Sequence, residues 1–429
     1  MPAIMQAIAT LTCFVGVLGS LYCLAEAFIV HRLTRLKGVR AASLVSTNSG
    51  TKLLTLPARC CTNDNSPAVS IFKPLGTSTP ELCRDIETLF AQDYTGTTEI
   101  IFGLHSDSNH AKEIVDQLKE SHPNIKVVVS FARHGTNAKV TNLLNMVPYA
   151  HNPIFVICDG DTAVPPDWLS TLIRTLEAPG VGLVSCLYSG APQRPLFWPI
   201  MSAMGMSYSF LPNVVLAAAT GLEKPCLGAT MAIRRTTLAE AGGFERLANT
   251  LADDYELGRA VRAEGYSVAL LMLAVRHNAV ETRASEFFAH ELRWARTIRM
   301  INPIGYVLSA ITHNVAFAAL GVIAYPTALT LSILACAIGA RIALQHVVDR
   351  AFDSWSGPAW LLPLRDLLNF LIFALTFMGK KVRWGGRVFD TSASSPAFEF
   401  DPSRDAHSVS GVPRAVNELG LTVFERGEG

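Results

Sequence analysis

The chain has 429 residues, of which half are hydrophobic and only 17% are charged, and its formal net charge at pH 7 is +1. Its mean hydropathy of +0.30 is too high for an ordinary soluble protein, and its length leaves room for a folded domain as well as membrane helices. The balanced charge gives no reason to expect a nucleic acid as partner. The nine cysteines show no C-x-x-C pair and no zinc spacing, so we interpret them as reduced thiols that pack as small hydrophobic groups.

Residues 1–30 are almost wholly apolar, with Glu26 near the end of the stretch, and a basic cluster follows them. A bilayer core needs about 20 apolar residues, so this stretch is long enough to span a membrane. The stretch at 25–27 also fits a signal-peptidase site, but no lysine or arginine precedes the apolar run. We therefore predict an uncleaved transmembrane anchor with its N-terminus outside and the basic cluster in the cytoplasm. Residues 31–67 are interpreted as a basic juxtamembrane segment and a linker rich in Ser, Thr, Asn and Pro.

Residues 68–282 are expected to form one α/β domain. Apolar runs of strand length alternate with amphipathic helical stretches, a pattern that predicts a mainly parallel, doubly wound sheet. The chain shows no P-loop and no GxGxxG motif, so neither an ATPase nor a Rossmann dehydrogenase is supported. Strands are predicted over 69–74, 99–104, 125–130, 153–158, 181–187 and near 228–234, and helices over 78–90, 111–120, 138–146 and 256–263.

The apolar run 153–158 is the most informative strand, because Asp159, Gly160 and Asp161 follow it directly. Two carboxylates at the carboxyl end of a buried strand would face the crevice where open α/β sheets bind ligands. Paired carboxylates suit Mg²⁺ or Mn²⁺ holding a diphosphate, since these cations prefer oxygen ligands. Asp-x-Asp alone is common, and a solvated loop after an ordinary strand is the alternative.

A second acidic cluster, Asp253-Asp254, opens a predicted helix. A carboxylate there can take a proton from an attacking hydroxyl if it points into the crevice. An acidic residue that balances the helix macrodipole is the alternative, which explains Asp253 better than Asp254.

A later helical stretch places His290, Arg293, Trp294 and Thr297 on one face. A cation beside an aromatic plane suits a diphosphate leaving group and a ring. The same pattern fits an amphipathic helix at a membrane surface, and both interpretations can hold for one helix.

These motifs, in this order and flanked by membrane segments, resemble the membrane-bound glycosyltransferases of families 2 and 21, whose pattern is D, DxD, (E/T)D, (Q/R)xxRW. The resemblance covers about residues 68–385 and is closest to the ceramide glucosyltransferase-like branch. Within that branch the chain is similar to the hopanoid biosynthesis-associated glycosyltransferases, through the stretches 72–75, 137–143 and 290–299. It implies a GT-A nucleotide-diphospho-sugar-binding fold between N- and C-terminal transmembrane helices.

The resemblance also implies roles for individual residues. Asp159 and Asp161 would hold the divalent cation and the nucleotide diphosphate, and Asp254 would be the general base. Arg293 and Trp294 would bind the diphosphate and close over the donor.

Three further residues are expected to bind substrate. Lys139 belongs to the shared stretch 137–143. His290 agrees with the hopanoid branch, whereas the ceramide and polysaccharide enzymes carry Gln or Arg at this position. Asp107 is the only carboxylate in the stretch where the family's first acid lies, and it would contact the uracil or ribose, although its register departs from the family pattern.

The C-terminal third is expected to be membrane-embedded. Residues 283–302 form the interfacial helix with the HxxRW motif, and membrane helices follow within 303–388, with spans predicted over 304–324 and 327–344. The stretch 358–378 contains Arg365-Asp366, which indicates a packed or interfacial helix. The basic run after it then stays in the cytoplasm if only two of these helices cross. Residues 389–429 are predicted to be a disordered tail.

The prediction is an inverting, metal-dependent glycosyltransferase of the bacterial inner membrane, with a cytoplasmic catalytic domain, a UDP-sugar donor and a lipid acceptor in the bilayer. The hopanoid branch implies UDP-N-acetylglucosamine and bacteriohopanetetrol. The apolar segment 197–219, with its methionines, is expected either to line the lipid entry or to pack in the core. A ceramide or other lipid glucosyltransferase is the nearest alternative. A processive polysaccharide synthase would need more spans, and a non-catalytic membrane binding protein or a transporter is the alternative of another class.

Overall fold

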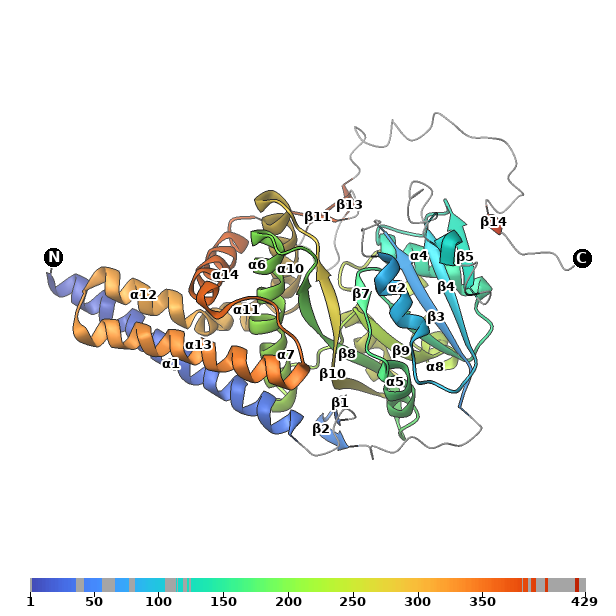
Figure 1. Ribbon diagram of the computed structural model, residues 1–429, viewed down its shortest axis with the longest axis horizontal. Helices are drawn as coiled ribbons and strands as arrows, with labels where there is room; N and C mark the ends of the chain where they lie inside the picture. The colour runs from blue at the N-terminus through green and yellow to red at the C-terminus, as the bar shows by residue number, and fades with distance from the viewer. Residues whose placement is uncertain are drawn as a thin grey trace, which may run out of the picture.

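The computed structural model describes residues 2–35, 42–55, 66–76, 82–104, 113, 115–118, 122, 125–379, 381–384, 387–390, 398–399 and 421–423. An α/β domain occupies one side of the molecule, and a bundle of long helices projects from the other side (Figure 1). Asp107 and half of the predicted helix 111–120 lie outside the described residues, and so does most of the tail 389–429, whose described parts are short strands.

Eleven described strands form one mixed sheet in the order β14-β5-β4-β3-β6-β9-β8-β10-β1-β2, with β7 paired to β10. Strands β5, β4, β3 and β6 are parallel, as are β8 and β10, whereas β9 runs antiparallel to both β6 and β8. The strands are β1 Ala42–Thr47, β2 Gly50–Thr55, β3 Val69–Leu75, β4 Thr98–Leu104, β5 Ile125–Ser130, β6 Ile154–Cys158, β7 Thr162–Ala163, β8 Val181–Pro192, β9 Thr230–Arg234, β10 Ser267–Ala279 and β14 Leu421–Val423.

The antiparallel β9 corrects the expectation of a mainly parallel, doubly wound sheet. Cys158, the last residue of β6, pairs with Thr230, the first residue of β9. The chain therefore leaves β8 and re-enters the sheet at the same edge, and a strand that begins there has to run in the opposite direction.

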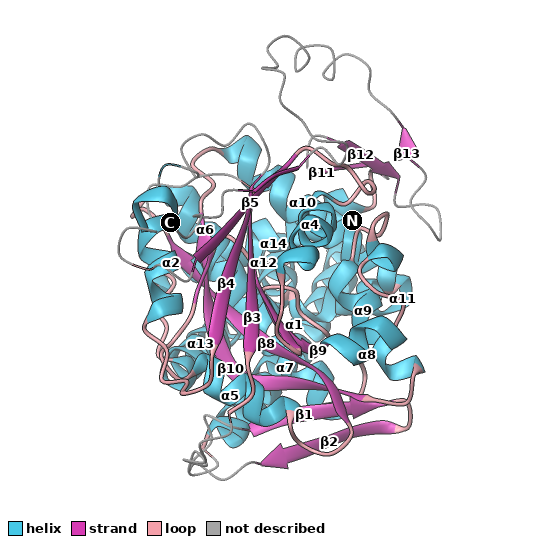
Figure 2. Cartoon of the chain, turned by 90° about the vertical axis from the view of Figure 1, so that its right-hand side faces the viewer, coloured by secondary structure: helices cyan, strands magenta, loops and turns pink. Residues whose placement is uncertain are grey.

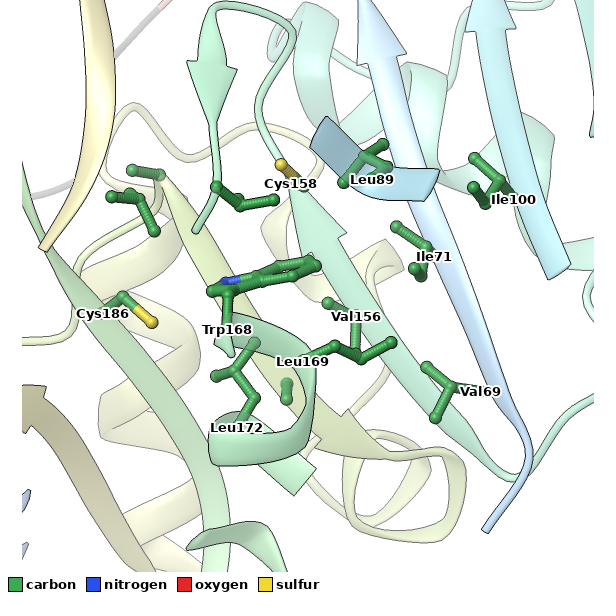
Figure 3. Close-up of a cluster of buried hydrophobic side chains, with 14 of the residues drawn as sticks. Val69, Ile71, Leu89, Ile100, Val156, Cys158, Trp168, Leu169, Leu172 and Cys186 are labelled. Carbon is green, nitrogen blue, oxygen red and sulfur yellow. The ribbon is translucent and has the colours of Figure 1, made fainter. Parts of the chain in front are cut away.

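Helices cover both faces of the sheet. One core contains α2 Leu82–Phe90 and α5 Trp168–Leu176, and the Trp168 ring lies beside Val156, Leu169 and Leu172 (Figure 3). The opposite core contains α4 Ala138–Met146, α8 Arg235–Glu240 and α9 Asp253–Ala263. Burying an aliphatic or aromatic side chain contributes about 1.5–3 kcal/mol, so these two layers fix the sheet edge at which the acidic motifs lie.

Residues 42–55, which we interpreted as linker, form a β-hairpin. Strand β1 pairs antiparallel with β10, and β2 is its outer neighbour (Figure 2). Ser43 and Ser46 are buried, and the Ser46 hydroxyl donates to the Val268 carbonyl at 3.1 Å. The serines made this stretch resemble a linker in composition, but pairing with β10 satisfies the backbone polar groups of β1.

The long apolar segment after β8 lies between the sheet and the helix bundle. It consists of α6 Phe197–Gly205, a π-helical turn Met206–Phe210 and α7 Leu211–Thr220. Met201, Met204 and Met206 are fully buried, so the methionines serve as core packing, which was one of the two expectations for this segment.

The helix bundle consists of α1 Pro2–Thr34, α12 Asn314–Ala324 and α13 Ala328–Phe352, which lie side by side (Figure 1). A Cβ added to Gly19 would lie 2.2 Å from the Ile311 carbonyl oxygen, so only glycine permits this close helix packing. Four described helices are long and apolar enough to cross a membrane, which indicates membrane association.

The predicted span over 304–324 is broken. Residues 303–312, which begin with α11 Pro303–Leu308, meet α12 at an angle of 60°. Ser309 and Thr312 sit in a 3₁₀ turn, and both hydroxyls bond back to carbonyls three residues earlier, which interrupts the α-helical pattern.

Helix α14 Leu362–Thr376 packs against other helices through its charged pair. Arg365 binds Glu291 at 2.8 Å, and Asp366 binds Arg341 at 2.8 Å. Both Arg365 and Asp366 are buried, as expected of a packed helix at this position. The strands that follow are β11 Lys381–Trp384, β12 Arg387–Asp390 and β13 Phe398–Glu399, and Val382 of β11 packs on Leu251 and Met300.

Candidate active site

A buried lysine binds the backbone of the acidic loop that follows β6. Lys73 of β3 is fully buried, and its ammonium donates to the carbonyls of Asp159 at 2.6 Å and Thr162 at 2.7 Å. A buried ammonium needs such partners, and in return it fixes the backbone between them. Lys73 belongs to the stretch 72–75 that carries the family resemblance, but nothing local to it predicts this contact.

Lys139 brings the two acidic clusters together. Its ammonium lies 2.5 Å from Asp159 Oδ1 and 4.0 Å from Asp253 Oδ2, and it donates to the Gly228 carbonyl at 2.9 Å. Burial acts to lower the pKa of Lys139, but the carboxylates of Asp159 and Asp253 outweigh it and raise that pKa above its usual value. For Asp159 the effects are reversed: burial raises the pKa of this carboxyl group, and the Lys139 ammonium acts to lower it.

The start of α4 explains why Lys139 points here. Asn137 caps the helix by accepting from the Val140 N–H at 3.0 Å. Its side-chain amide also donates to the Thr250 carbonyl at 2.8 Å and to Asp253 Oδ1 at 3.2 Å. One side chain thus begins α4 and ties it to the start of α9, which places Lys139 between the two clusters.

Asp254 faces Lys139 across a glycine. A Cβ added to Gly228 would lie 3.0 Å from Asp254 Oδ2 and 3.2 Å from Lys139 Nζ, so the space between these groups depends on glycine. Asp254 Oδ1 accepts from the Tyr255 N–H at 2.8 Å. Burial, with the nearby Asp253, raises the pKa of Asp254 to about 6, a value suited to a general base. Asp253 itself is buried and engaged by Asn137, consistent with a structural role.

Helix α10, Ala284–Ile301, carries the third motif. Trp294 packs edge-on against His290 with centroids 4.5 Å apart, and His290 Nδ1 pairs with the buried Glu281. Burial lowers the pKa of Arg293, and the carboxylate of Asp161 opposes that effect, so this guanidinium lies within electrostatic reach of the acidic loop. Thr297, expected on the same face, instead donates to the Arg293 carbonyl at 2.8 Å.

His277 of β10 is a site residue to which sequence reasoning gave no definite role. Its Nδ1 lies 3.4 Å from Asp161 Oδ1. The contact arises because β7, directly after the acidic loop, pairs with β10 at Thr162 and His277. No local motif signals it, since the pairing joins residues far apart in the chain.

The acidic loop suits a hard cation in donor chemistry. Asp159 Oδ1 and Asp161 Oδ1 are both buried and accept no hydrogen bond within the described part of the chain; their nearest side-chain partners are Lys139 and His277. Among the described residues, no three His, Cys, Asp or Glu side chains lie close enough to form a complete metal site. Asp161 and Asp159 therefore fit part of a coordination shell, with the remaining ligands left to substrate phosphate or water, as Mg²⁺ usually requires.

Known proteins with similar sequences include glycosyltransferases. Two ceramide glucosyltransferases of Caenorhabditis elegans are similar to the chain: ceramide glucosyltransferase 1 is 25% identical over 241 residues, and ceramide glucosyltransferase 3 is 23% identical over 233. Each alignment covers 54% of this chain, and the chain spans about half the length of these relatives, 49% and 50%.

Among solved structures, the mannosyltransferase PcManGT from Pyrobaculum calidifontis, in complex with GDP-mannose and Mn²⁺, aligns with a TM-score of 0.46 at 19% identity. That alignment covers 87% of this chain and 95% of the other. The model of glycosyl transferase family 21 matches residues 36–395, well over half of the chain. The chain therefore belongs to glycosyl transferase family 21, and it combines a mixed α/β fold with described helices that are long and apolar enough to cross a membrane.

Proposed function

We propose that this glycosyltransferase moves a hexose from a UDP-sugar to a hydroxyl of a membrane lipid, with inversion at the anomeric carbon. The observation that carries the proposal is the meeting of the two acidic clusters across Gly228: Lys139 pairs with Asp159 at 2.5 Å, and Gly228 separates it from Asp254. The Lys139–Asp159 pair, which would bind the diphosphate, and the Asp254 carboxylate, whose pKa is raised, thus face one small space.

The residues support a single displacement. Asp254 would take the proton of the acceptor hydroxyl while that oxygen attacks the anomeric carbon, and the bond from this carbon to the diphosphate would break, releasing UDP. Arg293 and Lys139 would neutralise charge that develops on the leaving diphosphate. A Mg²⁺ or Mn²⁺ ion held by Asp161 and Asp159 would supply further positive charge at the same oxygens. One base and no nucleophile of the enzyme's own give an inverted product.

The acceptor is proposed to be a lipid because the site adjoins the helix bundle. Trp294 of α10 packs near Phe210 of the segment that separates the sheet from the bundle, with ring centroids 6.2 Å apart. A lipid hydroxyl can reach such a site without leaving the membrane. We propose UDP-N-acetylglucosamine and bacteriohopanetetrol as the pair, in hopanoid biosynthesis, on the strength of the sequence resemblance. Ceramide with UDP-glucose is the second candidate, because the curated relatives are ceramide glucosyltransferases.

We also propose that the catalytic domain lies on the cytoplasmic face of a bacterial inner membrane. Both ends of α14 contact the domain side: Ser356, just before it, donates to the Gly190 carbonyl of β8, and Arg299 of α10 donates to the Thr376 carbonyl at its end. A helix that leaves and returns on one side does not cross, so α12 and α13 would be the two spans after the catalytic domain. This topology keeps residues 380–387 in the cytoplasm, as the positive-inside rule favours.

Label transfer from UDP-sugars into organic-extractable lipid tests the function. Membranes carrying the wild-type chain or Asp254→Asn would receive UDP-N-acetylglucosamine or UDP-glucose, Mg²⁺ or Mn²⁺, and either a hopanepolyol or ceramide. We expect metal-dependent transfer by the wild type and a loss of about 10²–10⁴-fold in the variant, the usual contribution of a general base. The preferred pair of substrates would identify sugar and lipid. Metal-independent lipid binding without any transfer would refute the proposal.

A further inference from the structure

Tyr188, near the C-terminal end of β8, is a residue to which no motif assigns a role. Its ring stacks on Phe210 with centroids 5.1 Å apart and planes at 26°. It also packs against His277 at 5.6 Å and against Trp294 at 6.1 Å. Phe210 ends the π-helical turn Met206–Phe210, and such turns occur often at functional sites. Rings from β10, α10 and the π-helical turn therefore hold the Tyr188 ring in one orientation.

The Tyr188 ring lies beside His277 and Trp294 of the candidate site, and the charges of that site act on its hydroxyl. Burial raises the pKa of Tyr188 well above its usual value, and the carboxylate of Asp254 adds to the effect, with Asp159 and Asp161 contributing less. Arg293 acts in the opposite direction. The phenol therefore stays protonated, so it can both donate and accept a hydrogen bond.

The geometry of the reaction determines which part of the substrate must lie near Tyr188. The anomeric carbon is bonded to the diphosphate before transfer and to the acceptor oxygen after it. The transferred sugar must consequently lie between the diphosphate-binding residues Asp161 and Arg293 and the proposed base, Asp254. Tyr188 is close to both sets, and its phenol hydroxyl can donate to or accept from the peripheral hydroxyls of a sugar.

We propose that Tyr188 binds the transferred hexose through its hydroxyl, which would hydrogen-bond to a sugar hydroxyl group while Phe210, His277 and Trp294 hold the ring in place. The inference rests on the proposed function, since it assumes a nucleotide-hexose donor. It predicts that Tyr188 recognises the sugar and contributes nothing to the binding of the nucleotide diphosphate alone.

Tyr188→Phe separates these two contributions, because it keeps the ring stacked on Phe210 and removes only the hydroxyl. We would measure equilibrium binding of UDP and of the UDP-hexose that the wild type prefers, and the kcat/KM for transfer. We expect unchanged affinity for UDP, weaker binding of the UDP-hexose, and a fall of about 10–100-fold in kcat/KM, as for one lost hydrogen bond to substrate.

Tyr306→Phe is the matched control. The ring of Tyr306 in α11 likewise packs on an aromatic ring, that of Phe373, and its hydroxyl lies 3.1 Å from Thr376 Oγ1. It lies outside the site, so its variant is expected to bind both nucleotides and to transfer sugar as the wild type does.

Two results would overturn the sugar contact: a Tyr188→Phe enzyme with wild-type kcat/KM and wild-type affinity for UDP-hexose, or one that loses affinity for UDP itself to the same degree. Failure of the proposed function would look different. In that case the wild type would transfer from no UDP-hexose and would bind UDP-hexose no differently from UDP, which would refute the function and the sugar contact together.

Discussion

The chain contains two sets of buried charges that differ in how firmly each is held. In the active site, one ammonium, Lys139, is shared among Asp159, Asp253 and the Gly228 carbonyl, and the carboxylates of Asp159 and Asp161 remain partly exposed. Among the packed helices, Arg341 pairs with Asp366 beside the buried Glu26, and Arg365 pairs with Glu291.

The surroundings of the two sets differ as well. Arg341, Arg365 and Asp366 are buried, and Arg341 also donates to Ser209 Oγ at 3.0 Å. A Cβ added to Gly205 would lie 1.7 Å from Arg365 Nη2, so the neighbouring helix is shaped around this guanidinium. The bundle charges thus fix the packing of helices, whereas the site charges share Lys139 and leave carboxylate surface open to a ligand. The comparison predicts that a charge removed from the site affects the rate, and one removed from the bundle affects the fold.

Asp159→Asn is expected to have the largest effect. The variant should lose about 10³-fold in kcat/KM, because the pairing with Lys139 and the contact to the donor diphosphate both depend on the carboxylate. Its Tm should change little, since Lys139 keeps the Gly228 carbonyl and Asp253. Steady-state transfer assays and thermal unfolding in detergent would measure the two quantities. A large fall in Tm would show that the site pair is structural.

Asp366→Ala should show the opposite behaviour. It leaves the Arg341 guanidinium buried without its carboxylate, which costs about 3–5 kcal/mol in the free energy of unfolding. Thermal unfolding and the yield of folded protein in detergent would report the loss. The triple variant Glu26→Gln, Arg341→Met, Asp366→Leu is the control, because it removes all three neighbouring buried charges and should recover much of the stability. If stability does not recover, these side chains stabilise the fold through more than the balance of their charges.

Gly228→Ala is expected to lower kcat/KM by about 10–100-fold, an effect of about 1.4–2.7 kcal/mol on the barrier. The added methyl would enter the space between Asp254 and Lys139, where its carbon would lie 3.0 Å and 3.2 Å from their polar atoms. Gly339→Ala is the matched control, since a Cβ at Gly339 meets nothing within 4 Å. Equal activity of the two variants would contradict a narrow reaction space at Gly228.

Local signals predicted much of the domain. Strand β5 and helix α4 have the predicted bounds, 125–130 and 138–146, because a short stretch rich in β-branched residues and an Asn-capped amphipathic stretch each determine structure from nearby residues. The strand before the acidic loop and the helix carrying Arg293 and Trp294 were predicted for the same reason. Family membership was also recognisable from the order of the motifs.

What sequence reasoning missed depends on pairing between distant segments. The hairpin β1–β2 exists because β10 offers it an edge, and β9 is antiparallel because its connection returns to the same edge of the sheet. His277 and Tyr188 reach the site through strand pairing and ring packing across elements, and Lys73 reaches it through backbone carbonyls. None of these contacts leaves a pattern within one window of the chain. Asp107 lies outside the described residues, and its role stays a prediction.

The smallest expected effect concerns pH and follows from Asp254. Its pKa is raised to about 6, above that of an unfolded aspartate, because burial disfavours the ionised form. The base acts only when ionised, so kcat/KM for transfer should be half-maximal near pH 6 and fall about tenfold for each unit below it. The same shift means that ionised Asp254 opposes folding at pH 7, so Asp254→Asn should not lower the Tm. We would measure the pH–rate profile of the wild type and compare it with the residual activity of Asp254→Asn over the same pH range. If the fall near pH 6 persists in the variant, the titrating group is another residue, with Asp159 the first to examine by Asp159→Asn.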